Sequence, residues 1–220
     1  MLGMLKAIYE DGLLGPLLGF KGGTLLYTQY NLPRFSTDLD FELLNKEKER
    51  LVFERLQKVA NKFGSIEQLI IKKYTIFCMI NYEKGEQNLK IEIHRENLGN
   101  RFENKNYLGI SILSMVKEDI FANKLVALTN RKTPANRDVF DTWFMLKSNW
   151  DINWKVVELR SGIKQKEYLE KCINLLENWP IINILERMGE LVDNKTKDWI
   201  KKNLIKDTIF LLKVRLEIKD

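Results

Sequence analysis

Residues 21–41 read KGGTLLYTQYNLPRFSTDLDF and hold a glycine turn, a short helical segment, a loop and two aspartates separated by one residue. Side chains alternate along a strand, so Leu39 and Phe41 would point to one face, and Asp38 and Asp40 to the other. The two carboxylates would then lie roughly 6.5–7 Å apart along the chain. This spacing lets both reach a shared pair of divalent cations.

The turn Gly22-Gly23-Thr24 lies upstream of the two aspartates. Its backbone N–H groups would be free to approach a phosphate at the start of a helix. Taken alone, two aspartates on a strand are more often solvated side chains, and a glycine pair is usually a turn. In this order they are more specific, because the helix N-terminus would lie close to the carboxylates. The stretch predicts a site for phosphoryl or nucleotidyl transfer.

The composition fits a globular protein of 220 residues, with 45% apolar residues and room for a substantial core. No run of 18 apolar residues predicts a transmembrane helix, and the N-terminus does not resemble a signal peptide. Cys78 and Cys172 are expected as buried thiols of a cytoplasmic protein. His94 is the only histidine, which excludes a zinc site with several histidines. The net charge of +6 weakly favours a polyanionic partner.

The first half of the chain alternates between strand and helix patterns. We expect a brief strand at 17–20 and a helix from Thr24 to Tyr30. Residues 46–63 have apolar residues at helical spacing. Segments 66–71, 74–82 and 89–93 are rich in β-branched and aromatic residues, and a turn at 83–88 would join the last two as an antiparallel hairpin. Residues 98–109 are interpreted as a polar connector.

Glu92 is a candidate third carboxylate. In Lys90–His94 apolar and polar residues alternate, so Glu92 would share the polar face of the sheet with Asp38 and Asp40 if Ile91 and Ile93 face the core. A third carboxylate from a neighbouring strand suits a two-metal centre. An exposed charge on a sheet face is the competing interpretation.

From about residue 112 the pattern becomes helical, which predicts a first domain at 1–112 and a helical second domain at 113–220 that contributes to the active site. A helix is expected at 114–130 and a basic loop at 131–136, followed by a helix that opens at Arg137. Asp138 and Asp141 are three residues apart and would be neighbours on that helix. Further helices are expected at 154–161, 164–179 and 195–218.

Three blocks of the sequence resemble the AbiEii/AbiGii toxin family of the nucleotidyltransferase superfamily. They are KGGT with RFSTDLDF, the strand NLKIEIHRE, and FANKLVALTNRKTPANRDVFDTWFML. The resemblance spans about residues 20–147. It implies an α+β fold with a polymerase-β-like nucleotidyltransferase core, a mixed or antiparallel sheet flanked by helices, and a helical C-terminal region. It also implies a toxin encoded beside an antitoxin in toxin–antitoxin and phage-defence (abortive infection) systems.

The resemblance assigns roles to individual residues. Gly22, Gly23 and Thr24 would hold nucleotide phosphates, with Lys21 directly before them. Arg34 and Ser36, beside the two aspartates, are further candidates for phosphate contacts, and a structural role in the loop is the alternative. Asp38 and Asp40 would bind Mg²⁺ or Mn²⁺, with Glu92 where the family pattern has Asp. Lys124 would neutralise phosphate charge as a compact cation. Asp141 or Asp138 would be the distal acidic residue, a base or an orienting group, and the sequence does not choose between them.

Three functions compete at this stage. The leading one is metal-dependent transfer of a nucleoside monophosphate from an NTP to RNA, the tRNA 3′ end above all, since several family members transfer nucleotides onto tRNA. Arg131, Lys132 and Arg137 are candidate contacts to the RNA phosphates. The second is transfer to a small molecule or a protein hydroxyl, because a fold does not fix the acceptor. The third is a catalytically silent protein-binding module.

Overall fold

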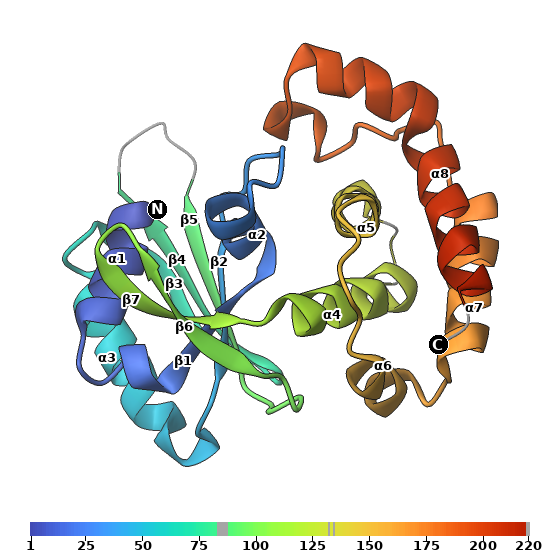
Figure 1. The fold of residues 1–220 in the computed structure, drawn as a ribbon. Coiled ribbons are helices and arrows are strands. Elements are labelled where there is room, and N and C mark those ends of the chain that lie inside the picture. Colours follow the sequence, from blue (N-terminus) through green and yellow to red (C-terminus); the bar gives the residue numbers. More distant parts are fainter. Residues whose placement is uncertain (83–87, 132, 134, 219–220) are drawn as a thin grey trace. The chain divides into compact units, whose positions relative to one another are not determined.

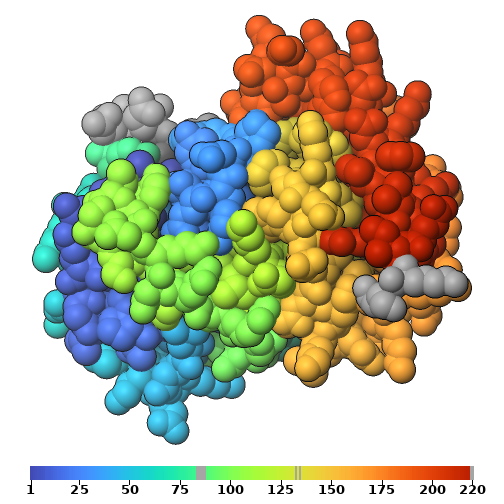
Figure 2. All heavy atoms as spheres, in the orientation of Figure 1, coloured from blue at the N-terminus to red at the C-terminus, as the bar shows by residue number. Residues whose placement is uncertain are grey.

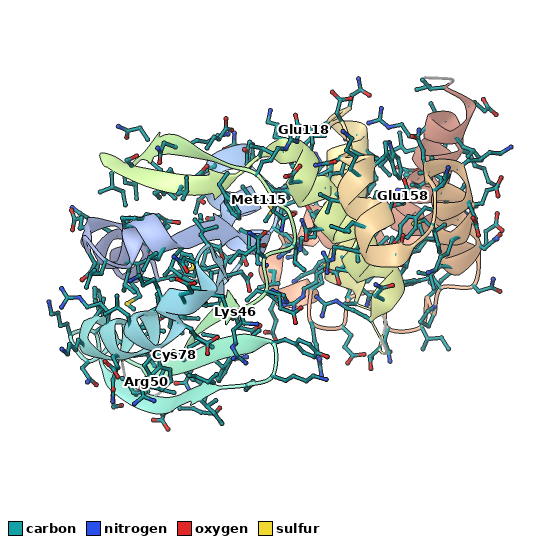
Figure 3. All side chains as sticks on the ribbon, turned by 90° about the horizontal axis from the view of Figure 1, so that it is seen from below. Lys46, Arg50, Cys78, Met115, Glu118 and Glu158 are labelled. Atoms are coloured by element: carbon teal, nitrogen blue, oxygen red, sulfur yellow. The ribbon has the colours of Figure 1, made fainter. Side chains whose placement is uncertain are left out.

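The computed structural model describes residues 1–82, 88–131, 133 and 135–218. The chain forms two compact units. Unit 1 comprises residues 1–31 and 36–116, and unit 2 comprises residues 32–35 and 117–220. Figure 3 labels Met115 at the end of β7 and Glu118 in the first turn of α4, where the chain passes from unit 1 to unit 2. The predicted change near residue 112 lies just before this passage.

Unit 1 contains a mixed seven-stranded sheet with the order β3-β4-β5-β2-β1-β7-β6 (Figure 1). Two neighbouring pairs are parallel, β1 with β7 and β2 with β5, and the other four are antiparallel. The strands are β1 (Leu18–Lys21), β2 (Leu39–Leu43), β3 (Ser65–Ile71), β4 (Thr75–Asn81), β5 (Leu89–His94), β6 (Phe102–Tyr107) and β7 (Ile110–Met115).

One face of this sheet is apolar and carries the core of unit 1. Phe41 contacts Phe20 and Tyr9, with ring centroids 5.5 and 6.3 Å apart. Tyr9 lies on α1, so α1 and its neighbour α3 cover this face. The helical elements of unit 1 are α1 (Leu2–Glu10), η1 (Gly15–Leu17), α2 (Gly22–Tyr30), η2 (Lys46–Lys48) and α3 (Glu49–Ala60).

The opposite face is set by the same alternation. Leu39 pairs with Ile91 and Phe41 with Ile93 across β2 and β5, and all four side chains are buried. The intervening pair, Asp40 and Glu92, therefore lies on the other side of the sheet. The expected separation of an apolar face from a carboxylate face is confirmed for Asp40 and Glu92. Asp38 precedes β2, which begins at Leu39, so its place on that face stays a prediction.

The interpretation of residues 98–109 as a polar connector is wrong. They contain β6, which pairs antiparallel with β7 through a two-residue turn at Leu108 and Gly109. Both turn residues have positive φ, 53° and 78°, as a type I′ hairpin turn requires. β6 is an edge strand, so it needs no apolar alternation, and its sequence FENKNY looks like a loop.

Unit 2 is helical, with α5 and α7 packed on α8 and α4 packed on α5 and α6. The segment 32–35 joins it, because the Phe35 N–H donates a hydrogen bond to the Leu191 carbonyl over 2.8 Å. The helices are α4 (Lys117–Asn130), α5 (Asn136–Lys147), α6 (Trp154–Ser161), α7 (Gln165–Glu177), η3 (Gly189–Leu191) and α8 (Asn194–Glu217).

The predicted α+β fold with a mixed sheet and a helical C-terminal region is confirmed. The helix expected at 114–130 begins at Lys117, because Ser114 and Met115 belong to β7. Most of the turn expected at 83–88 lies outside the described residues. None of the helices in the described part of the chain combines the length and hydropathy needed to span a bilayer.

Candidate active site

The glycine turn and the second aspartate are in direct contact. Gly22 opens α2 with φ of 82°, a conformation that side chains rarely adopt. A Cβ at Gly22 would lie 2.1 Å from Oδ2 of Asp40. Only a residue without a side chain leaves room for the carboxylate at this position. The N-terminus of α2 and the carboxylate of β2 thus meet, as the order of the two motifs predicts.

Thr24 connects the same helix to the first aspartate. Its side chain is fully buried, and its hydroxyl donates a hydrogen bond to the backbone carbonyl of Asp38. A hydroxyl has a single proton to donate. The Thr24 hydroxyl therefore fixes the residue that precedes β2, and only its backbone N–H is left for the predicted phosphate contact.

Asp40 and Glu92 are register partners on the parallel strands β2 and β5. The Asp40 side chain is half-buried and that of Glu92 is exposed. Among the residues that the structure describes, no three acidic, histidine or cysteine side chains come together as a metal site. Mg²⁺ is usually held by one or two carboxylates together with substrate phosphates, and this arrangement suits that mode.

A buried glutamate that the sequence reading did not single out extends the carboxylate face. Glu42 is fully buried and accepts hydrogen bonds from the Asn100 amide over 2.6 Å and from the Leu98 N–H over 3.4 Å. Its Oε2 lies 3.6 Å from the Lys21 ammonium. Lys21 is also the register partner of Asp40. Glu42 therefore holds the Lys21 cation on the face that carries Asp40.

His94 lies beside this pair, as the register partner of Glu42 on β5. Burial and the charge of Lys21 lower the pKa of His94, and the nearby Glu42 and Glu96 oppose this only in part. The imidazole is therefore neutral at pH 7 and contributes no charge to the site.

In unit 2 the predicted basic and acidic residues form a buried ion cluster. Arg34 donates two hydrogen bonds to Asp141, from Nε over 2.6 Å and from Nη2 over 2.7 Å. The Lys124 ammonium lies 2.6 Å from the second oxygen of Asp141. The Arg34 and Asp141 side chains are 3% and 0% exposed. The guanidinium that was expected to contact phosphate is therefore committed to a carboxylate in this structure.

Asp141 is the charge that balances this cluster. Burial raises the pKa of its carboxyl, but the Arg34 and Lys124 charges outweigh burial and lower that pKa to about 2. A carboxylate with so low a pKa, and with both oxygens occupied, is a poor proton acceptor at neutral pH. The geometry favours Asp141 as an orienting group over Asp141 as a base.

Asp138 lies one turn earlier on α5, with its side chain 1% exposed. Its oxygens face Arg131, in close contact, and Lys124, at 3.6 Å, yet neither oxygen has a hydrogen bond of good geometry to a residue that the structure describes. The hydroxyl of Thr142 is likewise buried, and the described part of the chain offers it no hydrogen-bond partner. Within residues 1–82, 88–131, 133 and 135–218, the cluster therefore combines three cations, Arg34, Lys124 and Arg131, with two carboxylates.

The structure brings the predicted residues together in two groups. Unit 1 holds Lys21, Gly22, Gly23, Thr24, Ser36, Asp38, Asp40 and Glu92, and unit 2 holds Arg34, Lys124, Asp138 and Asp141. Ser36 is buried, 9% exposed, which limits the contact it offers to a nucleotide. That both groups serve one catalytic centre stays a prediction.

Comparisons with known proteins identify the family and the fold of the chain. Residues 4–199 match a family model described as the nucleotidyl transferase AbiEii toxin of type IV toxin–antitoxin systems. A candidate nucleotidyltransferase from Helicobacter pylori has a similar structure, with a TM-score of 0.61, 20% identity, and 98% of this chain and 94% of that chain covered. JHP933 from Helicobacter pylori is also similar, with a TM-score of 0.60, 18% identity, and coverages of 98% and 91%. These two likenesses establish a shared fold. No curated protein sequence matches the chain.

Proposed function

Because the chain belongs to the AbiEii family, the nucleotidyl transferase toxins of type IV toxin–antitoxin systems, we propose that it transfers a nucleoside monophosphate from an NTP to an RNA acceptor, the tRNA 3′ end. A ribose hydroxyl of the acceptor attacks the α-phosphorus, the new P–O bond forms, and the bond to pyrophosphate breaks. The hydroxyl proton passes to solvent. The family implies an antitoxin partner, and we place the protein in phage defence.

The observation that carries this proposal is the contact between Gly22 and Asp40. It sets the start of α2 directly against a carboxylate. The first N–H groups of a helix attract phosphate oxygens, and a carboxylate attracts the cation that accompanies a nucleotide. The N-cap residue of α2, Lys21, makes no side-chain capping hydrogen bond to the helix.

Mg²⁺, or Mn²⁺, is the cation we propose for this site. Asp38, Asp40 and Glu92 would hold it together with phosphate oxygens, since hard cations prefer oxygen ligands. When bound, the cation supplies charge neutralisation at the triphosphate and lowers the pKa of a coordinated hydroxyl.

The chain's own residues bind and orient the nucleotide. The N–H groups of Gly22 and Gly23 would receive phosphate oxygens, and the Lys21 ammonium would add positive charge. The ion pair with Glu42 restricts the position of that ammonium group. In unit 2, Asp141 fixes the Lys124 ammonium at 2.6 Å, so a phosphate contact by Lys124 would need no ordering of a flexible side chain.

Charge supports RNA as the acceptor. Of the 36 Lys and Arg and 30 Asp and Glu in the chain, 21 basic and 16 acidic residues lie in unit 2, against 15 and 14 in unit 1. Almost all of the net charge of +6 is therefore carried by unit 2. A cationic surface attracts the phosphate backbone of any RNA.

The test is incubation of the protein with total tRNA, Mg²⁺ and each labelled NTP in turn. We expect label in tRNA with the unmodified protein, and a loss of about 100-fold or more with Asp40→Asn. Asp198→Asn, an exposed aspartate on α8, is the matched control and should keep full activity.

Two results would contradict the proposal. Full activity of Asp40→Asn would remove Asp40 from the catalytic site. Label in a small molecule or in protein, with none in RNA, would support nucleotidyl transfer but show that RNA is not the acceptor.

A further inference from the structure

Unit 2 has a hollow on its surface that the proposed catalytic residues do not use. It has a volume of about 350 Å³ and lies between α5 and α8. In Figure 2 the yellow atoms of α5 and the orange-red atoms of α8 adjoin at the surface. The volume falls at the small end of the range for ligand pockets, about 300–1,000 Å³. The lining includes Pro33, Phe140, Trp143, Lys147, Lys195 and Trp199.

The floor of the hollow is aromatic. The Trp143 ring lies 4.2 Å from the Trp199 ring and 5.4 Å from the Phe140 ring, centroid to centroid. Phe140 is fully buried and Trp143 is 8% exposed, so both pack α5 into the unit. Trp199 is only half-buried. It is the indole that a ligand in the hollow could reach.

The rim of the hollow is cationic. The Lys147 ammonium lies 4.8 Å from the centroid of the Trp143 ring, and Lys195 is exposed in the first turn of α8. None of the described residues that line the hollow is acidic. The carboxylate of Asp193, two residues before Lys195, accepts a hydrogen bond from the Thr196 N–H over 2.7 Å and so caps α8. An anion with a flat apolar part complements this floor and rim.

We propose that this hollow binds one unpaired nucleotide of a single-stranded RNA. The base would stack on Trp199, and the adjoining phosphates would lie against Lys147 and Lys195. Stacking on aromatic side chains together with a cationic groove is how proteins bind single strands without reading their sequence. The identification of the ligand as RNA rests on the acceptor of the proposed function. The hollow would then be a binding site for the acceptor strand on unit 2.

The competing occupant is an acidic segment of a protein, which would also meet the two lysines. It would leave the partly exposed Trp199 without a flat partner. A nucleotide uses both features of the hollow, and we therefore assign it to RNA.

The experiment measures binding without catalysis. The host protein is the Asp40→Asn variant without NTP, and the probes are a fluorescein-labelled single-stranded oligoadenylate and its abasic counterpart. Trp199→Ala should weaken binding of the oligoadenylate about tenfold and leave the abasic strand unchanged. Lys195→Gln should weaken both strands to a similar extent, because it removes a phosphate contact.

Matched controls keep the result interpretable. Trp154→Ala removes a half-buried indole of α6 outside the hollow, and Lys58→Gln removes an exposed lysine of unit 1; both should bind as the host does. Trp199→Phe keeps a ring against Trp143 and should recover part of the lost affinity. If Trp199→Ala melts early, Trp199→Phe and Lys195→Gln decide the question.

Three outcomes would overturn the assignment. They are equal binding of the oligoadenylate by the host and Trp199→Ala, equal loss with Trp154→Ala, and displacement of the oligonucleotide by a glutamate peptide whose own binding needs Trp199. Failure here differs from failure of the proposed function. If the transfer assay labels RNA but Trp199→Ala binds the oligoadenylate as the host does, only the proposal for the hollow is refuted. If oligoadenylate binding needs Trp199 but the transfer assay labels no RNA, only the proposal that RNA is the acceptor is refuted.

Discussion

At Gly22 the absence of a side chain decides the geometry of the candidate active site. Its φ of 82° and the 2.1 Å between an added Cβ and Asp40 are two separate obstacles to any other residue. We predict that Gly22→Ala abolishes nucleotidyl transfer and lowers the free energy of unfolding by about 2–5 kcal/mol. The measurements are transfer to tRNA and urea denaturation.

Gly109 provides the matched control. Its φ of 78° is nearly the same, and a Cβ there would meet nothing within 4 Å. Gly109→Ala therefore introduces backbone strain without a steric clash. It should lower the free energy of unfolding by about 1–2 kcal/mol and keep full transfer activity. Equal losses of stability and activity in both variants would show that the contact with Asp40 is unimportant.

The low pKa of Asp141 leads us to predict that unit 2 loses stability at low pH. Its pKa is lowered to about 2 by Arg34 and Lys124, below the ordinary 3.8. A lowered pKa means that the carboxylate stabilises the fold above pH about 4, and that this contribution is lost as the pH falls towards 2. The loss should be about 2–3 kcal/mol. Urea denaturation at a series of pH values measures it.

Asp141→Asn separates this carboxylate from the other acids. The substitution removes the negative charge that balances Arg34 and Lys124 in the cluster, so we expect a loss of about 3–5 kcal/mol at pH 7. The variant should lose less further stability on acidification than the unmodified protein, because the titrating group is gone. Parallel pH curves for the two proteins would refute the assignment. Glu158→Gln on the surface of α6 is the control.

At the scale of the element, alternation along a strand predicted more than any single motif. Because side chains alternate, Asp38-Leu39-Asp40-Phe41 indicated which face of β2 is apolar, and the structure confirms this. The same alternation continues to Glu42, which is not among the residues predicted for the site. A fully buried glutamate is unusual. Glu42 is hydrogen-bonded by Asn100, which lies 58 residues away in the sequence. No local sequence pattern predicts this contact.

The hairpin of β6 and β7 shows a second limit and gives a prediction. Leu108 occupies a turn position with φ of 53°, where a leucine is strained, and its side chain is 62% exposed. Leu108→Asn should raise the free energy of unfolding by about 0.5–1 kcal/mol, since asparagine suits a type I′ turn. Thermal unfolding measures the change.

Leu159→Asn is the control for the turn. Leu159 is 73% exposed within α6, where asparagine is the weaker helix former. Removing that exposed leucine should give no gain in stability. A similar gain in both variants would mean that the loss of exposed apolar surface, and not the turn, is responsible.

At the scale of the whole molecule, the chain passes between the two units three times, at 31/32, 35/36 and 116/117. The last passage is visible in the sequence as a change from strand to helix pattern. The passages at 31/32 and 35/36 are not visible, because the four residues 32–35 are too few to show a helical or strand periodicity. Arg34 was predicted as a neighbour of the aspartate pair on sequence distance alone. Its partner, Asp141, is 107 residues away, and only folding reveals the pair.

The unequal charge of the two units predicts how RNA binding responds to salt. If RNA lies on unit 2, about four phosphate contacts would weaken binding roughly 50-fold between about 50 and about 200 mM salt. Lys202→Gln with Lys206→Gln on α8 should weaken binding and flatten the salt dependence. Lys46→Gln with Lys58→Gln, the same change of charge on unit 1, should have the smaller effect. Fluorescence anisotropy of labelled tRNA measures both, and equal effects would assign the attraction to the total charge of the chain.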